Sequence, residues 1–93
     1  IHRDTGPLHA DRVVTFVFYL FREPRCFSGG DLLLHDWSAE GLPRAQRFTR
    51  LHPANNRLVI FPSECWHQVL PVSCHTGDPL DARLTVHGWF HAV

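Results

Sequence analysis

The segment RVVTFVFYLF, residues 12–21, is the most regular stretch of this 93-residue chain. β-Branched and aromatic residues fill it, and such residues favour extended strands. Its two alternating sets, one beginning at Val13 and the other at Val14, are both largely apolar. A strand that is apolar on both faces is typical of a sheet that is covered on both sides. We therefore expect one face of this strand to lie in the core and the other to lie under another part of the protein.

Shorter strand-like segments separated by turn residues follow. We expect further strands at residues 31–36, 46–52, 57–61, 66–70 and 82–90, a turn at residues 28–30, and loops at residues 37–45 and 73–81. No long window has the periodicity of a helix. Six short strands of this kind indicate an all-β sandwich or barrel. Because no linker or internal repeat interrupts the pattern, we expect one domain over residues 1–93.

The composition excludes several classes of protein. The nine basic residues, all of them Arg, balance nine acidic residues, so the strongly basic surface of a typical nucleic-acid-binding protein is absent. No apolar run reaches the roughly 18 residues of a membrane span, and residues 1–6 lack the layout of a signal peptide. Cys26, Cys65 and Cys74 form no C-x-x-C pair, so we expect free thiols. These features predict a soluble, cytoplasmic protein.

Two histidines and one aspartate form a candidate metal site. His2 and Asp4 are two positions apart, so on an extended strand their side chains share a face and can converge on one ion. Such a pair is common by chance, but His67, which follows a Pro-Ser turn, offers a third ligand. Two His and one carboxylate leave open positions on one side of the metal and suit non-haem Fe(II), whereas zinc more often takes a closed tetrahedral set.

A lone cation lies within the last expected strand. Its alternate residues form one set: Arg83, Thr85, His87 and Trp89. If this set lines a barrel, the buried guanidinium needs an anion, and a dicarboxylic acid would supply one in bidentate geometry. Thr85 could donate a further hydrogen bond. Alternatively, Arg83 faces solvent while Leu84 and Val86 point inward, and the spacing alone does not decide between the two.

Six motifs in order give the chain a family resemblance. They are His2-x-Asp4, VTFVFYL at residues 14–20, GGDL at 29–32, RLVIFPS at 57–63, WHQVLPV at 66–72 and RLTVHGWF at 83–90. Each motif is loose by itself, but together they span nearly the whole chain. Their order and spacing resemble the iron(II) and 2-oxoglutarate dependent dioxygenases of the prolyl 4-hydroxylase-like branch. The resemblance implies a double-stranded β-helix, which is a jelly-roll, cupin-like barrel with the metal at its open mouth.

The resemblance also implies a role for each matched residue. The implied Fe(II) ligands are His2, Asp4 and His67, and the implied 2-oxoglutarate contacts are Arg83 and Tyr19, at the distal carboxylate, with Thr15 and Thr85 lining the same pocket. Trp89, His87 and Val69 are expected in the pocket or behind the ligands. O2 would be the second cosubstrate, and ascorbate is a further candidate cofactor. No catalytic residue is expected beyond the metal centre itself.

The implied activity is hydroxylation with release of succinate and CO2. The substrate would be a peptidyl residue, with proline the leading candidate, or a small molecule. One alternative is a cupin-type metal protein that does not use 2-oxoglutarate, and another is a non-catalytic, truncated β-barrel binding module. Arg83 and Tyr19 separate the first reading from the others, because they serve no purpose without a dicarboxylate.

The position of the metal motif near the start of the sequence affects the prediction of whether the chain is a complete domain. The chain begins almost on His2, whereas members of this branch carry a helical segment and at least one strand before that motif. We expect the 93 residues to be the C-terminal core portion of a longer oxygenase domain, in preference to a minimal barrel completed by oligomerisation or a degenerate domain.

Overall fold

The computed structural model describes residues 1–6 and 10–92, and the described chain is nearly all β. Its elements are β1 (Arg12–Leu20), β2 (Phe27–Gly29), β3 (Leu32–Trp37), β4 (Pro43–Leu51), β5 (Arg57–Pro62), β6 (Trp66–Val69), β7 (Val72–Cys74), the 3₁₀ turn η1 (Pro79–Asp81) and β8 (Leu84–His91). The prediction of an all-β fold is therefore confirmed.

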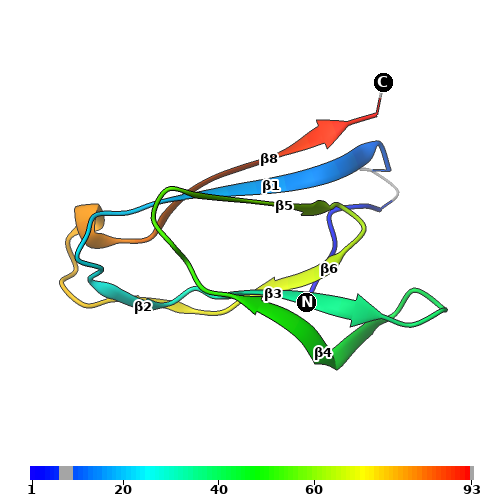
Figure 1. Ribbon diagram of the computed structural model, residues 1–93, viewed down its shortest axis with the longest axis horizontal. Coiled ribbons are helices and arrows are strands. Elements are labelled where there is room, and N and C mark those ends of the chain that lie inside the picture. Colours follow the sequence, from blue (N-terminus) through cyan, green and yellow to red (C-terminus); the bar gives the residue numbers. More distant parts are fainter. Residues whose placement is uncertain (7–9, 93) are drawn as a thin grey trace.

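The strands form two facing three-stranded sheets (Figure 1). One has the order β5-β1-β8 and the other β4-β3-β6, while β2 and β7 form a two-stranded ribbon, and all pairs are antiparallel. An isolated bridge between His2 and His67 adds the first residues to the edge of β6. Within residues 1–6 and 10–92 the strands do not close into a continuous barrel, so the jelly roll is not confirmed.

Several expected boundaries are wrong for a physical reason. The expected loop at residues 37–45 contains the end of β3 and the start of β4, because β4 is exposed along most of its length and shows no apolar alternation. Its strand conformation comes from pairing with β3. The ribbon of β2 and β7, with three residues in each strand, is too short to show a period, so its strands overlap the expected turn and loop.

Apolar residues between the two sheets form the core. Leu32 of β3 and Phe61 of β5 are 1% and 5% exposed and pack with Cys65. A second cluster, made by Tyr19, Phe21 and Phe27, lies toward the β2-β7 ribbon. These two clusters fix the spacing of the sheets and hence the space that remains between them.

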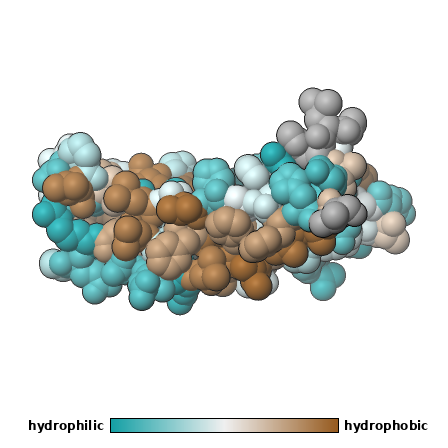
Figure 2. Space-filling view, turned by 90° about the horizontal axis from the view of Figure 1, so that it is seen from above, coloured by the Kyte–Doolittle hydropathy of each residue, from teal (hydrophilic) through white to brown (hydrophobic). Residues whose placement is uncertain are grey.

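The outer face of the β5-β1-β8 sheet is apolar and exposed, as the band of hydrophobic surface in Figure 2 shows. Register places these exposed residues on that face: Leu20, Leu58, Ile60, Leu84, Val86 and Phe90. The expectation that β1 is covered on both sides is therefore met on the inner face only. Nothing in the described part of the chain covers the outer face.

Two further expectations concern the whole molecule. Cys26, Cys65 and Cys74 are all free, as predicted from their spacing. No helix among the described residues is long and apolar enough to cross a membrane.

The buried Leu32 and the exposed Leu58 predict different losses of folding stability when each side chain is shortened to alanine. Leu32→Ala should lower the free energy of unfolding by about 2–5 kcal/mol, because it leaves a cavity between the sheets. Leu58→Ala, at a side chain that is 58% exposed, should change it by no more than about 0.5 kcal/mol. Urea denaturation followed by circular dichroism measures both. A large cost at Leu58 would show that the outer face is covered in solution.

Candidate metal centre and adjoining pocket

A backbone contact brings the three candidate ligands together. The His2 amide donates to the carbonyl of His67 at 2.8 Å, and the His67 amide donates back to His2 at 2.7 Å. The Asp4 amide donates to the carbonyl of Ser63 at 3.0 Å. Residues that are far apart in sequence are thus held as neighbours by the extended backbone of residues 2–4 alongside β6.

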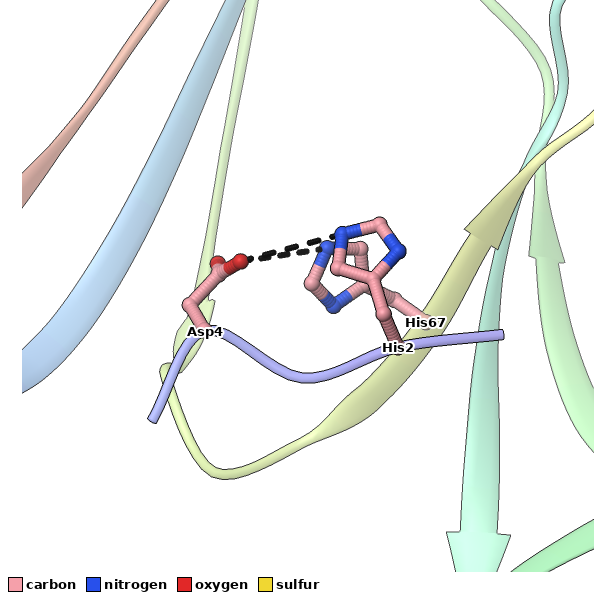
Figure 3. A group of neighbouring side chains, drawn as sticks. All are labelled: His2, Asp4 and His67. Carbon is pink, nitrogen blue, oxygen red and sulfur yellow. Dashed lines mark ion pairs between the residues drawn. The ribbon is translucent and has the colours of Figure 1, made fainter. Parts of the chain in front are cut away.

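The side chains of His2, Asp4 and His67 point toward one another (Figure 3). Oδ1 of Asp4 lies 3.8 Å from Nε2 of His2 and 3.6 Å from Nε2 of His67. One potential ligand atom from each residue falls within a group spanning 4.8 Å, and no other such group of three occurs in the described part of the chain. This geometry allows all three to bind one ion.

Hydrogen bonds fix the protonation pattern of the site. Nδ1 of His67 lies 3.1 Å from the carbonyl oxygen of Cys65, which only accepts, so this nitrogen carries the proton and leaves the Nε2 lone pair facing Asp4. Oγ1 of Thr15 donates to Oδ2 of Asp4 at 2.6 Å. A ligand histidine whose second nitrogen is anchored in this way is typical of metal sites.

Electrostatics favours the ionisation states that metal ligands need. Burial raises the pKa of Asp4, but the hydrogen bond from Thr15, the neighbouring Trp89 indole and the two imidazoles outweigh burial and lower that pKa overall. Burial lowers the pKa of His67, and the opposing effects of Cys65 and Asp4 do not cancel this. At neutral pH the centre therefore holds a carboxylate and a neutral imidazole, both able to bind a cation.

A pocket of about 320 Å³ extends from the triad between the two sheets. All ten residues selected from the sequence line it: His2, Asp4, Thr15, Tyr19, His67, Val69, Arg83, Thr85, His87 and Trp89. The sequence left open which face of the last strand points inward. In the structure the alternate residues that begin at Arg83 line the pocket, while Leu84 and Val86 are exposed. Val17, Leu32 and Phe61 complete the lining with apolar surface.

Arg83 is an unpaired cation in this pocket. Its Nε is buried and has no hydrogen-bond partner among the described residues, and its guanidinium carbon lies 5.8 Å from the ring centre of Tyr19. Burial raises the pKa of Tyr19, although Arg83 acts in the opposite direction, so the phenol stays neutral and can donate. A half-buried guanidinium whose buried Nε has no partner in the described part of the chain favours an anionic ligand.

Sequence reasoning missed several contacts that shape the pocket. A Cβ on Gly30, whose φ is +80°, would lie 2.9 Å from Cδ and Nε of Arg83, so only glycine fits beside that arginine. Arg12 stacks on the indole of Trp89 with its guanidinium carbon 3.7 Å from the ring centre. Ser63, which is fully buried, lies 3.0 Å from Thr15. The GGDL and RLVIFPS motifs contain Gly30 and Ser63, but the sequence did not reveal their contacts.

The fold and the site define a β protein in which two histidines and one carboxylate lie together at a pocket. The Arg83 guanidinium in this pocket favours an anionic ligand. Comparison with protein families agrees with this description, because residues 1–91 match the model of the 2OG-Fe(II) oxygenase superfamily. The chain belongs to that superfamily.

A curated relative supports the same assignment. An uncharacterised PKHD-type hydroxylase of Synechocystis is 37% identical over 92 residues, covering 96% of this chain and 30% of the relative. The chain thus spans about a third of the length of that protein. No solved structure matches the chain.

The charge of Asp4 should be visible in the titration of His67. We expect the His67 pKa to lie below the ordinary value of about 6.5, and Asp4→Asn to lower it further by removing a nearby negative charge. Because the folded-state pKa is the lower one, the stability that depends on neutral His67 is lost as pH falls through that pKa. NMR of the imidazole protons in the metal-free protein measures both values.

A neutralising substitution elsewhere is the matched control. Glu40→Gln, in the exposed loop between β3 and β4, should leave the titration of His67 unchanged. A His67 pKa above the ordinary value, or one that rises in Asp4→Asn, would contradict the electrostatic description.

Proposed function

We propose that this chain is part of the catalytic core of an Fe(II)- and 2-oxoglutarate-dependent dioxygenase with a double-stranded β-helix fold. It hydroxylates a peptidyl residue, with proline the leading candidate, or a small molecule, and releases succinate and CO2. The observation that carries the proposal is the unpaired, buried Nε of Arg83 in the same pocket as the His2, Asp4 and His67 triad. Family membership supports the same reading.

The triad fits a resident Fe(II). Two imidazoles and one carboxylate are the donor set that suits this ion in oxygenases, and the low pKa values of Asp4 and His67 keep both groups ready to bind at neutral pH. When bound, the iron supplies the oxidising chemistry, using O2 and 2-oxoglutarate. Ascorbate as an additional cofactor remains a prediction.

The other end of the pocket fits the distal carboxylate of 2-oxoglutarate. Arg83 offers a guanidinium fork with no anionic partner among residues 1–6 and 10–92, while Tyr19 and Thr85 offer hydroxyl donors in the same pocket. Thr15, which contacts Asp4, is four residues from Tyr19 on β1, so their Cα atoms are about 13 Å apart along the strand. The side chains at the triad end and at the Arg83 end both extend into this space. The remaining length is enough for a five-carbon diacid.

The remaining lining of the pocket is apolar. Val17, Leu32 and Phe61 contribute apolar wall, and a less polar environment strengthens the pairing between Arg83 and a bound carboxylate. His87 and Trp89 lie on the triad side of the same strand face as Arg83 and leave the metal reachable from the pocket. The protein's contribution is thus to position cosubstrate and substrate at one coordination site.

Loss of the Arg83 charge should weaken cosubstrate binding and leave metal binding unchanged. Anaerobic titration of the Fe(II) protein with 2-oxoglutarate should produce the weak visible charge-transfer band of the chelate. Arg83→Gln should weaken 2-oxoglutarate binding by about 100-fold, the cost of about 3 kcal/mol expected for a charged hydrogen-bonded partner. Its Fe(II) affinity should be unchanged. Arg47→Gln, at an exposed arginine on β4 outside the pocket, is the matched control and should bind both normally.

The outcomes separate the alternatives. Fe(II) binding without any chelate band would favour a cupin-type metal protein that does not use 2-oxoglutarate. A folded protein that binds neither ligand would be a non-catalytic β module. Asp4→Ala should lose the band together with the metal.

A further inference from the structure

Two buried hydroxyl groups lie directly behind the candidate ligand Asp4. Thr15, on the inner face of β1, is 4% exposed, and Ser63, after β5, is 0% exposed. Oγ1 of Thr15 donates to Oδ2 of Asp4 at 2.6 Å, and Oγ of Ser63 lies 3.0 Å from Oγ1 of Thr15. The three groups form one chain of hydrogen bonds.

The direction of this chain follows from counting protons. Oγ1 of Thr15 donates to Oδ2 of Asp4, so the single hydroxyl proton of Thr15 is used in that bond. Oγ1 of Thr15 can then act only as an acceptor toward Ser63, and the shared contact must use the Ser63 proton. The order is therefore Ser63 to Thr15 to Asp4, and each bond polarises the next.

The two oxygens of Asp4 are thereby given different surroundings. Oδ1 lies 3.8 and 3.6 Å from the Nε2 atoms of His2 and His67, whereas Oδ2 accepts the hydrogen bond from Thr15. A carboxylate that is free to rotate could offer both oxygens to one ion. Here the short bond to Thr15 occupies one oxygen and restrains that rotation.

Ser63 is itself held in place by two other segments. Its amide donates to the carbonyl of Val13 at 3.0 Å, and its carbonyl accepts from the Asp4 amide at 3.0 Å. One residue therefore ties the backbone of the ligand segment to β1, while its side chain supports the ligand carboxylate through Thr15. Its fixed position sets the position of the hydroxyl of Thr15.

We propose that Thr15 and Ser63 are positioning residues that hold Asp4 as a one-oxygen metal ligand, with Oδ1 directed at the ion and Oδ2 kept out of its coordination sphere. This inference rests on the proposed function, because it assumes that the triad binds a metal. The consequence is that Asp4 occupies one coordination position only, which leaves the others open to cosubstrate and O2.

Cobalt(II) alone tests the inference without requiring turnover. It replaces Fe(II) in sites of this donor type, and its visible absorption bands report the number of ligand atoms. Thr15→Val, which keeps the shape but removes the hydroxyl, should weaken Co(II) binding by about 10- to 100-fold, the usual cost of losing a group that supports a ligand. Its bands should also shift in position and intensity. Thr15→Ser, which keeps the hydroxyl, should restore wild-type affinity and spectrum.

A double-mutant cycle tests the order of the chain. Ser63→Ala should weaken Co(II) binding less than Thr15→Val does, and it should add nothing when Thr15 is already Val, because Ser63 acts only through Thr15. Thr49→Val, at an exposed position on β4, is the matched control for the substitution and should bind Co(II) normally. Circular dichroism and a urea transition confirm that each variant is folded.

Each outcome supports or overturns the inference. Unchanged affinity and spectrum in a folded Thr15→Val variant would overturn it and leave the proposed function intact, as would additive effects in the double mutant. Failure of the unsubstituted protein to bind Co(II) would overturn the proposed function as well. If Thr15→Val does not fold, Thr15→Ser and Ser63→Ala decide: retained binding in both would overturn the inference, and loss in Ser63→Ala alone would support it.

Discussion

The pairing of His2 with His67 is the contact on which the rest of the site depends. Two backbone hydrogen bonds align the first residues of the chain with β6, and this alignment sets the directions of all three candidate ligands. Asp4 then falls beside Ser63 and faces Thr15 on the opposite sheet. The triad is thus a product of strand alignment, and the same alignment closes one end of the pocket.

The pocket between the sheets has opposite electrical character at its two ends. The triad end holds the Asp4 carboxylate with neutral His67, which attracts a cation. The Arg83 end carries a guanidinium that has no anionic partner in the part of the chain that the structure describes. Val17, which lies between Thr15 and Tyr19 on β1, adds apolar surface between the two ends. A ligand that bridges them must be anionic where it meets Arg83 and able to bind a metal at the other end. Family membership agrees with that requirement.

Local patterns in the sequence predicted the residues of the site better than the contacts between them. Alternation placed Arg83 and Trp89 on one face, and the structure shows that this face lines the pocket. The contacts of Thr15 with Asp4 and Ser63 depend on how separate segments align, which single-strand periodicity does not encode. The same limit explains β4, whose exposed residues carry no apolar period, and the three-residue strands β2 and β7. The resemblance to a family supplied what periodicity could not, namely a predicted role for each matched side chain.

The ligand set also joins distant parts of the chain. Asp4 and His67 are 63 positions apart, so an ion bound by both would close a loop covering most of the molecule, much as a removable cross-link does. In the chain-entropy description, closing a loop of this length restricts the unfolded state by about 4 kcal/mol. Metal binding then requires that residues 2–4 are docked against β6, so the metal affinity depends on the equilibrium between the docked and undocked states of this segment. A substitution far from the centre that loosens this docking would therefore appear as weaker metal binding.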